Sequence, residues 1–208
     1  MPLDFPSEGY NLTEDPEVLP ENLLRTECLK VFVEFLQTSG AANAKNHVIL
    51  KIDFKTTCEG YRGTRISMDV KFDLVARGLM TRSRGISVHP NLPLSYIIDT
   101  LLHHRLHDFY FTNINARYYG CRDFIAQALT VLRSQTYIDP YIVRSIPTNP
   151  EMPVDSVFDA LGMRFRGGGF SAFPIDRGSF AEFQRVEEGL PYDGSWRAAE
   201  IESLISSL

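Results

Sequence analysis

Apolar and polar residues alternate in the first segment of the chain that has a clear pattern. In residues 28–37 every second side chain is apolar, which predicts a half-buried strand. A helix is the alternative there, because Phe32 and Leu36 also recur at helical spacing. The acidic, proline-rich residues 1–22 precede this strand, and they are expected to form an extended or disordered arm.

Two β-branched segments follow, at residues 47–54 and 65–75. A polar stretch with two glycines, residues 55–64, separates them, so we expect an antiparallel hairpin. A further short strand is expected within residues 76–93. Together with residues 28–37, these segments predict a small antiparallel sheet.

The spacing of apolar residues then changes to that of helices. Residues 93–109 carry apolar side chains at i, i+3, i+4, i+7 and i+8, and Pro93 suits a first helical turn, so a helix is expected that ends near Arg105. A second helix is predicted from Cys121 to Ser134. Its buried stripe should consist of Phe124, Ile125, Ala128, Leu129 and Leu132.

The C-terminal part is less regular. Residues 153–163 and 179–188 predict short helices, the second with Ser179 as N-cap, and the last residues predict a terminal helix. Between them, residues 164–178 contain three glycines and are expected to form a flexible loop, either a lid or a plain connection.

The overall expectation is an α+β fold. A small antiparallel sheet should pack against two central helices, and additional C-terminal helices should follow. The predicted division is an arm at residues 1–22, a core domain at residues 23–150 and a helical and loop extension at residues 151–208.

Composition narrows the class of protein. The chain has 208 residues, of which 44% are hydrophobic, so it can build a substantial core. Its net charge is −5, and the basic residues are scattered, which disfavours nucleic acid as a partner. The absence of a long apolar run and of a signal pattern predicts a cytoplasmic protein without a membrane span. Three widely spaced cysteines predict no disulfide framework. The pattern predicts neither a cofactor nor an oligomeric state.

Candidate chemistry centres on Cys121, which opens a predicted helix. The partial positive charge and free amides of a helix N-terminus favour a thiolate. A nucleophilic cysteine also needs a base and a group that orients this base. His47, at the start of a predicted strand, is the candidate base, and Asp69 on the next strand is the candidate orienting group. The alternatives are a packing cysteine and a histidine at the rim of the sheet.

The stretches "NHVILKIDF", "GTRISMDV", "IIDTLLHHRLHDFYF" and "YYGCRDFIAQAL" together resemble a family of small, mostly uncharacterised fungal proteins. Their order is also similar to that of the permuted papain-like superfamily of the lecithin retinol acyltransferase type. This resemblance implies a histidine strand that precedes a cysteine at a helix start. Cys121, Phe124 and His47 match it, whereas Gly120 and Val48 replace its usual asparagine and tryptophan.

Further side chains are candidates for substrate binding. Tyr118 and Tyr119 could line an aromatic pocket beside the cysteine, or belong to the core of the turn. Arg122 and Arg166 could bind an acidic substrate, or face water.

His103 and His107 have the spacing of metal ligands on a helix. However, no acidic residue or cysteine joins them nearby, so no metal is expected.

These observations predict a cysteine-dependent hydrolase or acyltransferase. It would act on an acyl, amide or thioester bond of a small-molecule substrate, and the fungal resemblance suggests specialised metabolism. One alternative is a non-hydrolytic binding or cyclase-type protein on the same scaffold, in which Cys121 forms part of a pocket wall. Another is a protein-interaction module that uses the acidic arm.

Overall fold

The structure is a computed structural model, and it describes residues 19–37, 46–66, 79–114, 117–138, 161, 163–166, 169–172 and 178–180. Most of the predicted arm, Asp69 and the predicted helices beyond Phe180 lie outside the described residues.

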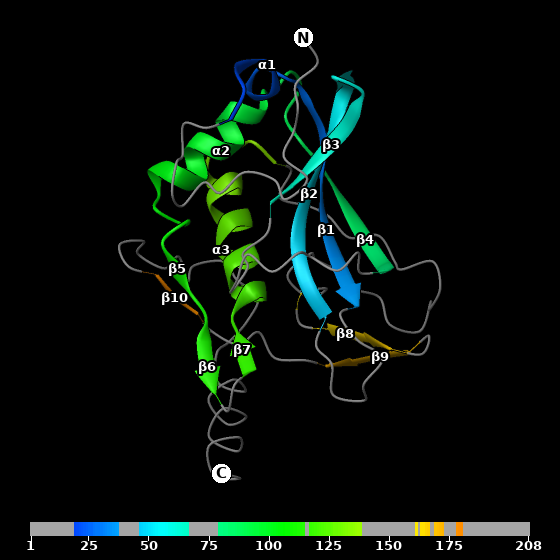
Figure 1. Ribbon diagram of the computed structural model, residues 1–208, viewed down its shortest axis with the longest axis vertical. Coiled ribbons are helices and arrows are strands. Elements are labelled where there is room, and N and C mark those ends of the chain that lie inside the picture. Colours follow the sequence, from blue (N-terminus) through cyan, green and yellow to red (C-terminus); the bar gives the residue numbers. More distant parts are fainter. Residues whose placement is uncertain are drawn as a thin grey trace.

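An antiparallel sheet of four strands, in the order β3-β2-β1-β4, forms one layer of the molecule (Figure 1). Its strands are β1 (Cys28–Gln37), β2 (Asn46–Cys58), β3 (Tyr61–Ile66) and β4 (Leu79–Ser87). The strand predicted at residues 28–37 is confirmed at both ends, and the helical alternative for it is wrong.

The start of β1 departs from simple alternation. The register between β1 and β2 shifts between Cys28 and Lys30, as in a β-bulge. Consequently Leu29, which alternation predicts to be buried, is 49% exposed, whereas Cys28 is buried. Beyond the shift, Val31 and Val33 alternate into the core as predicted.

The hairpin of β2 and β3 is confirmed as antiparallel, but its turn is much shorter than the predicted residues 55–64. Strand β2 ends at Cys58 and β3 begins at Tyr61. The two residues between them, Glu59 and Gly60, have positive φ angles of 50° and 87°. Lys55 and Thr56 are exposed and polar, so the sequence has no apolar alternation that would indicate a strand at these two positions.

Three helices are described: α1 (Glu21–Leu24), α2 (Leu94–His103) and α3 (Cys121–Ser134). Pro93 is the N-cap of α2, so the helix begins one position after the predicted start. The predicted bounds of α3 are confirmed. Figure 1 shows α2 and α3 beside the same face of the sheet, and α3 packs against β2.

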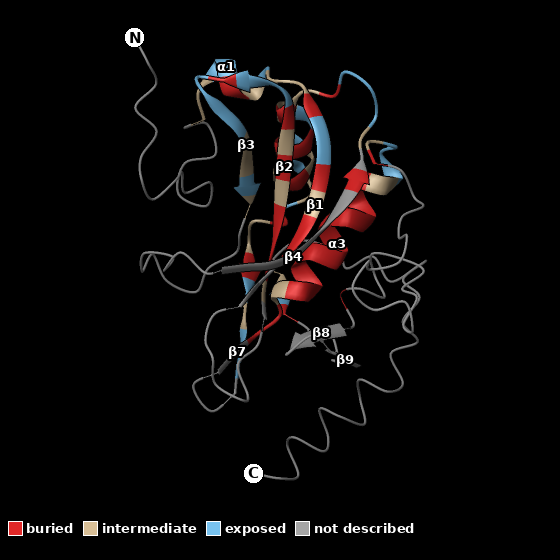
Figure 2. Cartoon of the chain, turned by 90° about the vertical axis from the view of Figure 1, so that its right-hand side faces the viewer, coloured by how far each residue is buried: buried red, intermediate tan, exposed pale blue. Residues whose placement is uncertain are grey.

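Helix α3 forms the centre of the core. Every residue from Arg122 to Leu132 is buried, including the whole predicted stripe, as the burial colours in Figure 2 show. It contacts β2, whose Val48, Leu50 and Ile52 belong to the same hydrophobic cluster. A helix buried on all sides is held by its surroundings, so its first turn has a fixed environment.

Short strands surround the lower end of α3 in Figure 1. They form three pairs: β5 (Phe109–Tyr110) with β10 (Ser179–Phe180), β6 (Thr112–Ile114) with β7 (Arg117–Tyr119), and β8 (Met163–Arg166) with β9 (Gly169–Ala172).

Two expectations for this region are wrong. Residues 164–178 were expected to be a loop, but β8 and β9 pair there as antiparallel strands. Ser179 was expected to cap a helix, but it lies in β10 and pairs with Tyr110 of β5.

The protein therefore combines helices with antiparallel sheets, in an α+β architecture. Within the described ranges, no helix has both the length and the apolar character needed to span a bilayer.

Candidate active site

The first residues of β2 and the first turn of α3 come together at one end of the sheet. Asn46 begins β2 and Cys121 begins α3, and the two elements pack against each other. Figure 1 shows both starts in the lower half of the molecule, near the β6–β7 and β8–β9 hairpins. The fold thus brings together two sequence motifs that lie more than 70 residues apart.

The side chains of His47 and Cys121 contact each other directly. They form a hydrogen bond, and the backbone N–H of Val48 donates a second hydrogen bond to the Cys121 sulfur. Both Cys121 and His47 are half-buried. The sulfur is therefore enclosed on the β2 side by one ring nitrogen and one amide.

Opposing influences act on the pKa of the Cys121 thiol. Burial is the largest, and it acts to raise the pKa, because a thiolate loses hydration. Against it act the hydrogen bond with His47, the charges of His47 and Arg122, and the Val48 amide. Together they outweigh burial, so the pKa of Cys121 lies below its ordinary value. The site thus favours the nucleophilic form of the sulfur.

The chain enters α3 through Gly120, which has a φ of 124°. A side chain would be strained in this conformation, and a Cβ atom would lie 2.9 Å from Cζ of Phe109 and 3.0 Å from the backbone of Gly178. Gly120 also accepts the hydrogen bond from the Phe124 amide that closes the first helical turn, at 3.0 Å. Glycine at this position therefore permits Cys121 to begin the helix in a crowded place.

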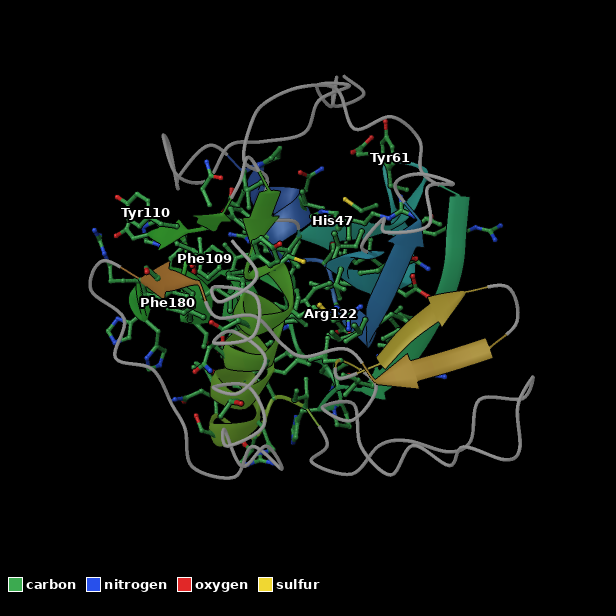
Figure 3. The ribbon with its side chains drawn as sticks, turned by 90° about the horizontal axis from the view of Figure 1, so that it is seen from below. His47, Tyr61, Phe109, Tyr110, Arg122 and Phe180 are labelled. Atoms are coloured by element: carbon green, nitrogen blue, oxygen red, sulfur yellow. The ribbon has the colours of Figure 1, made fainter. Side chains whose placement is uncertain are left out.

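Arg122 is buried, with 3% of its surface exposed. Its Nη1 donates a hydrogen bond of 2.5 Å to the carbonyl oxygen of Leu161. Figure 3, which views the molecule from below, shows Arg122 and His47 near the middle of the view. The guanidinium thus lies inside the protein and adds positive charge near the thiol.

Asp123 is also buried, with 1% of its surface exposed. Its Oδ2 accepts a hydrogen bond of 2.9 Å from the backbone N–H of Gly178, and its Oδ1 lies 3.5 Å from Nε2 of Gln127. A carboxylate in the first turn of a helix is also favoured by the helix dipole. The sequence motif did not identify Asp123, although an acid among apolar positions of a predicted core helix is a usable signal.

Of the remaining predicted site residues, the structure describes the side chain of one. Tyr119 is buried at the end of β7. Tyr118 and Arg166 lie on β7 and β8, but their side chains, like the whole of Asp69, lie outside the described parts of the chain.

His103 and His107 do not join a cluster that suits a metal ion. Across the described ranges, no group of three or more histidine, cysteine or acidic residues is arranged to hold one. His103 instead packs edge-on against His104, and Nε2 of His107 lies 3.7 Å from Oδ1 of Asp108.

No family model matches the sequence, and no curated protein or solved structure matches it significantly.

Proposed function

We propose that the protein is a cysteine-dependent hydrolase or acyltransferase with Cys121 as nucleophile and His47 as base. The hydrogen bond between these two side chains carries the proposal. It supports a nucleophile and base within mutual reach, which is the arrangement that covalent catalysis by cysteine requires. The lowered pKa of the Cys121 thiol supports it further.

In the first half of the proposed reaction, the Cys121 sulfur forms a bond to the carbonyl carbon of an ester, amide or thioester. The carbonyl electrons move to oxygen, and the backbone N–H of Cys121 at the start of α3 is the candidate donor to this oxyanion. His47 holds the thiol proton and transfers it to the leaving alcohol, amine or thiol as that bond breaks. An S-acyl enzyme results.

In the second half, water or another alcohol or amine attacks the S-acyl carbon. His47 accepts the proton of this nucleophile, and the Cys121 sulfur leaves as thiolate. Water as nucleophile makes the reaction a hydrolysis, and another acceptor makes it an acyl transfer. This chemistry needs no cofactor.

Asp69 is retained in the proposal as the group that orients His47. This role rests on the sequence pattern alone, in which Asp69 lies on the strand predicted after that of His47.

The resemblance to the permuted papain-like superfamily agrees with this arrangement of a histidine strand and a cysteine helix, and we propose that fold for the protein. A small-molecule substrate, a cytoplasmic location and a role in specialised metabolism stay predictions. Tyr118, Tyr119 and Arg166 stay predicted substrate contacts, whereas the buried Arg122 is proposed to act on the thiol.

Acylation of the intact protein tests the proposal. After incubation with p-nitrophenyl acetate near pH 7, mass spectrometry should detect one acetyl group on a peptide that contains Cys121. Cys121→Ser should lose this adduct, whereas Cys28→Ser, the matched control, should keep it. Acetylation that is equal on all three cysteines, or absent from Cys121, would contradict the proposed function and favour the non-hydrolytic scaffold.

A further inference from the structure

The buried Asp123, two residues after the nucleophile, contacts a distant part of the chain. We infer that Asp123 is a positioning residue for Cys121, and that it acts by anchoring the segment Gly178–Phe180 to the first turn of α3. The inference rests on the proposed function, because it concerns the geometry of the same nucleophile.

The hydrogen bond between Asp123 and Gly178 is the first support. The carboxylate and the Gly178 amide are both buried, and their separation is 2.9 Å. A buried amide that loses its acceptor is not compensated for its lost hydration, so this bond strongly favours one position of the segment. Of the two carboxylate oxygens, Oδ2 serves Gly178, while Oδ1 faces Gln127 on the next turn of α3.

Close backbone packing is the second support. Gly120 and Gly178 approach so closely that a Cβ on Gly120 would lie 3.0 Å from both N and Cα of Gly178. A Cβ on Gly178 would overlap the ring of Phe109 and lie 3.0 Å from the carbonyl oxygen of Tyr110. The N-cap of α3 and Gly178 therefore fit together only as glycines, which leaves the N-cap little room to move on this side.

Strand β10 continues this contact beyond Gly178. Ser179 pairs with Tyr110, and Phe180 pairs with Phe109. The ring centroids of Phe109 and Phe180 are 4.9 Å apart, and those of Phe109 and Phe124 of α3 are 5.8 Å apart. Figure 3 shows Phe109 and Phe180 next to each other beside α3. The aromatic contacts thus hold the segment on the flank of the helix.

The consequence for Cys121 follows from the geometry of its own hydrogen bonds. The sulfur must stay within reach of the His47 ring and of the Val48 amide, and such bonds weaken steeply with misalignment. Any shift of the first turn of α3 moves the sulfur relative to β2. Arg122 adds a second tether, to Leu161, so two consecutive residues after Cys121 bind backbone groups of the C-terminal region.

The test is the pH profile of Cys121 alkylation by iodoacetamide in full-length variants. Asp123→Ala removes the acceptor, so the alkylation profile should move to higher pH. If the pKa of the Cys121 thiol rises by about one, the alkylation rate at pH 6 should fall about tenfold. Asp123→Asn keeps an oxygen that can accept from Gly178, and its rate should stay within about twofold of the wild-type rate. Asp99→Ala, on the exposed side of α2, is the matched control and should leave the profile unchanged.

Phe180→Ala is a second variant that loosens β10 and leaves both partners of the hydrogen bond intact. Its alkylation profile should also move to higher pH, but by less than that of Asp123→Ala. An unchanged profile in folded Asp123→Ala, or in Phe180→Ala if Asp123→Ala does not fold, would overturn the inference. Equal losses in the alanine and asparagine variants would overturn it as well. A wild-type Cys121 that reacts like a free cysteine would overturn the proposed function together with it.

Discussion

Cys28 and Cys121 lie in the same protein, and their thiols respond to it in opposite ways. Burial raises the pKa of Cys28 to about 12. Burial also acts on Cys121 as the largest single influence, yet the pKa of Cys121 is lowered. The difference between the two cysteines is therefore one of neighbours rather than of burial alone.

Cys28 lies at the start of β1, among the residues of the hydrophobic core. Its backbone N–H donates to the carbonyl oxygen of Leu92 at 2.7 Å, which satisfies the main chain. Burial is the influence that sets its pKa, because no charge or donor there offsets the loss of hydration. Such a thiol behaves as a small apolar side chain.

Cys121 has a histidine, an arginine and a backbone amide as neighbours, and each of them favours the anion. The groups around Cys121 therefore favour a negative charge on its sulfur.

Replacement of the sulfur should remove the chemistry altogether. Cys121→Ser is nearly isosteric, so the fold should persist, while acetylation of residue 121 by the activated ester should fall below detection. Mass mapping together with thermal unfolding checks both statements. If a biological activity survives in Cys121→Ala, the covalent mechanism is wrong and the side chain serves for packing.

Replacement of the base should make Cys121 resemble an ordinary cysteine. His47→Ala removes the hydrogen bond and the opposite charge, while the raising effect of burial remains. An opposite charge is worth about 1–3 pKa units, so the alkylation rate at pH 6 should fall by about 10- to 1000-fold. His89→Ala is the control, because His89 is exposed and distant in sequence from the site. An alkylation profile that does not move would disprove the pairing.

Removal of the buried charge should have a smaller effect in the same direction. Arg122→Gln abolishes the positive charge that lowers the pKa of Cys121, so the midpoint of alkylation should rise and the rate at pH 6 should fall about threefold to tenfold. The exposed Arg62→Gln provides a control with the same charge change. If both variants behave alike, the local charge of Arg122 has no role.

Replacement of Cys28 should change stability and leave reactivity unchanged. Cys28→Ala leaves a small cavity in the core, and it should lower the free energy of unfolding by about 1 kcal/mol in urea titration. The alkylation profile of Cys121 should stay the same. In the wild type, Cys28 should resist iodoacetamide at neutral pH, because its raised pKa leaves almost no thiolate. Rapid labelling of native Cys28 would contradict this contrast.

The sequence predicted helix α3 best, and the reason is local. An apolar stripe of helical period runs from Phe124 to Leu132, and Gly120 precedes it, so both the type and the bounds follow from neighbouring residues. The turn between β2 and β3 was misplaced because exposed residues such as Lys55 extend the strands without an apolar pattern. The glycines of residues 164–178 indicated a loop, but residues 163–166 and 169–172 pair as antiparallel strands.

Half of the candidate site could be predicted in the same way. Cys121 at a helix start and His47 at a strand start are visible as local patterns, and their hydrogen bond follows once the two elements pack. Asp123 and Gly178 could not be paired from sequence, because no periodicity links residues so far apart. The Val48 amide is a backbone group, and the sequence gives no indication of its direction.

The distance along the chain between Asp123 and Gly178, 55 residues, also has a consequence during synthesis. At about 5–20 residues per second, a ribosome needs about 3–11 s to extend the chain from one to the other. During this interval Cys121 and His47 are already synthesised, but the strand that holds the first turn of α3 does not exist. On the inferred role of Asp123, Cys121 gains its full reactivity only after Gly178 has been added to the chain.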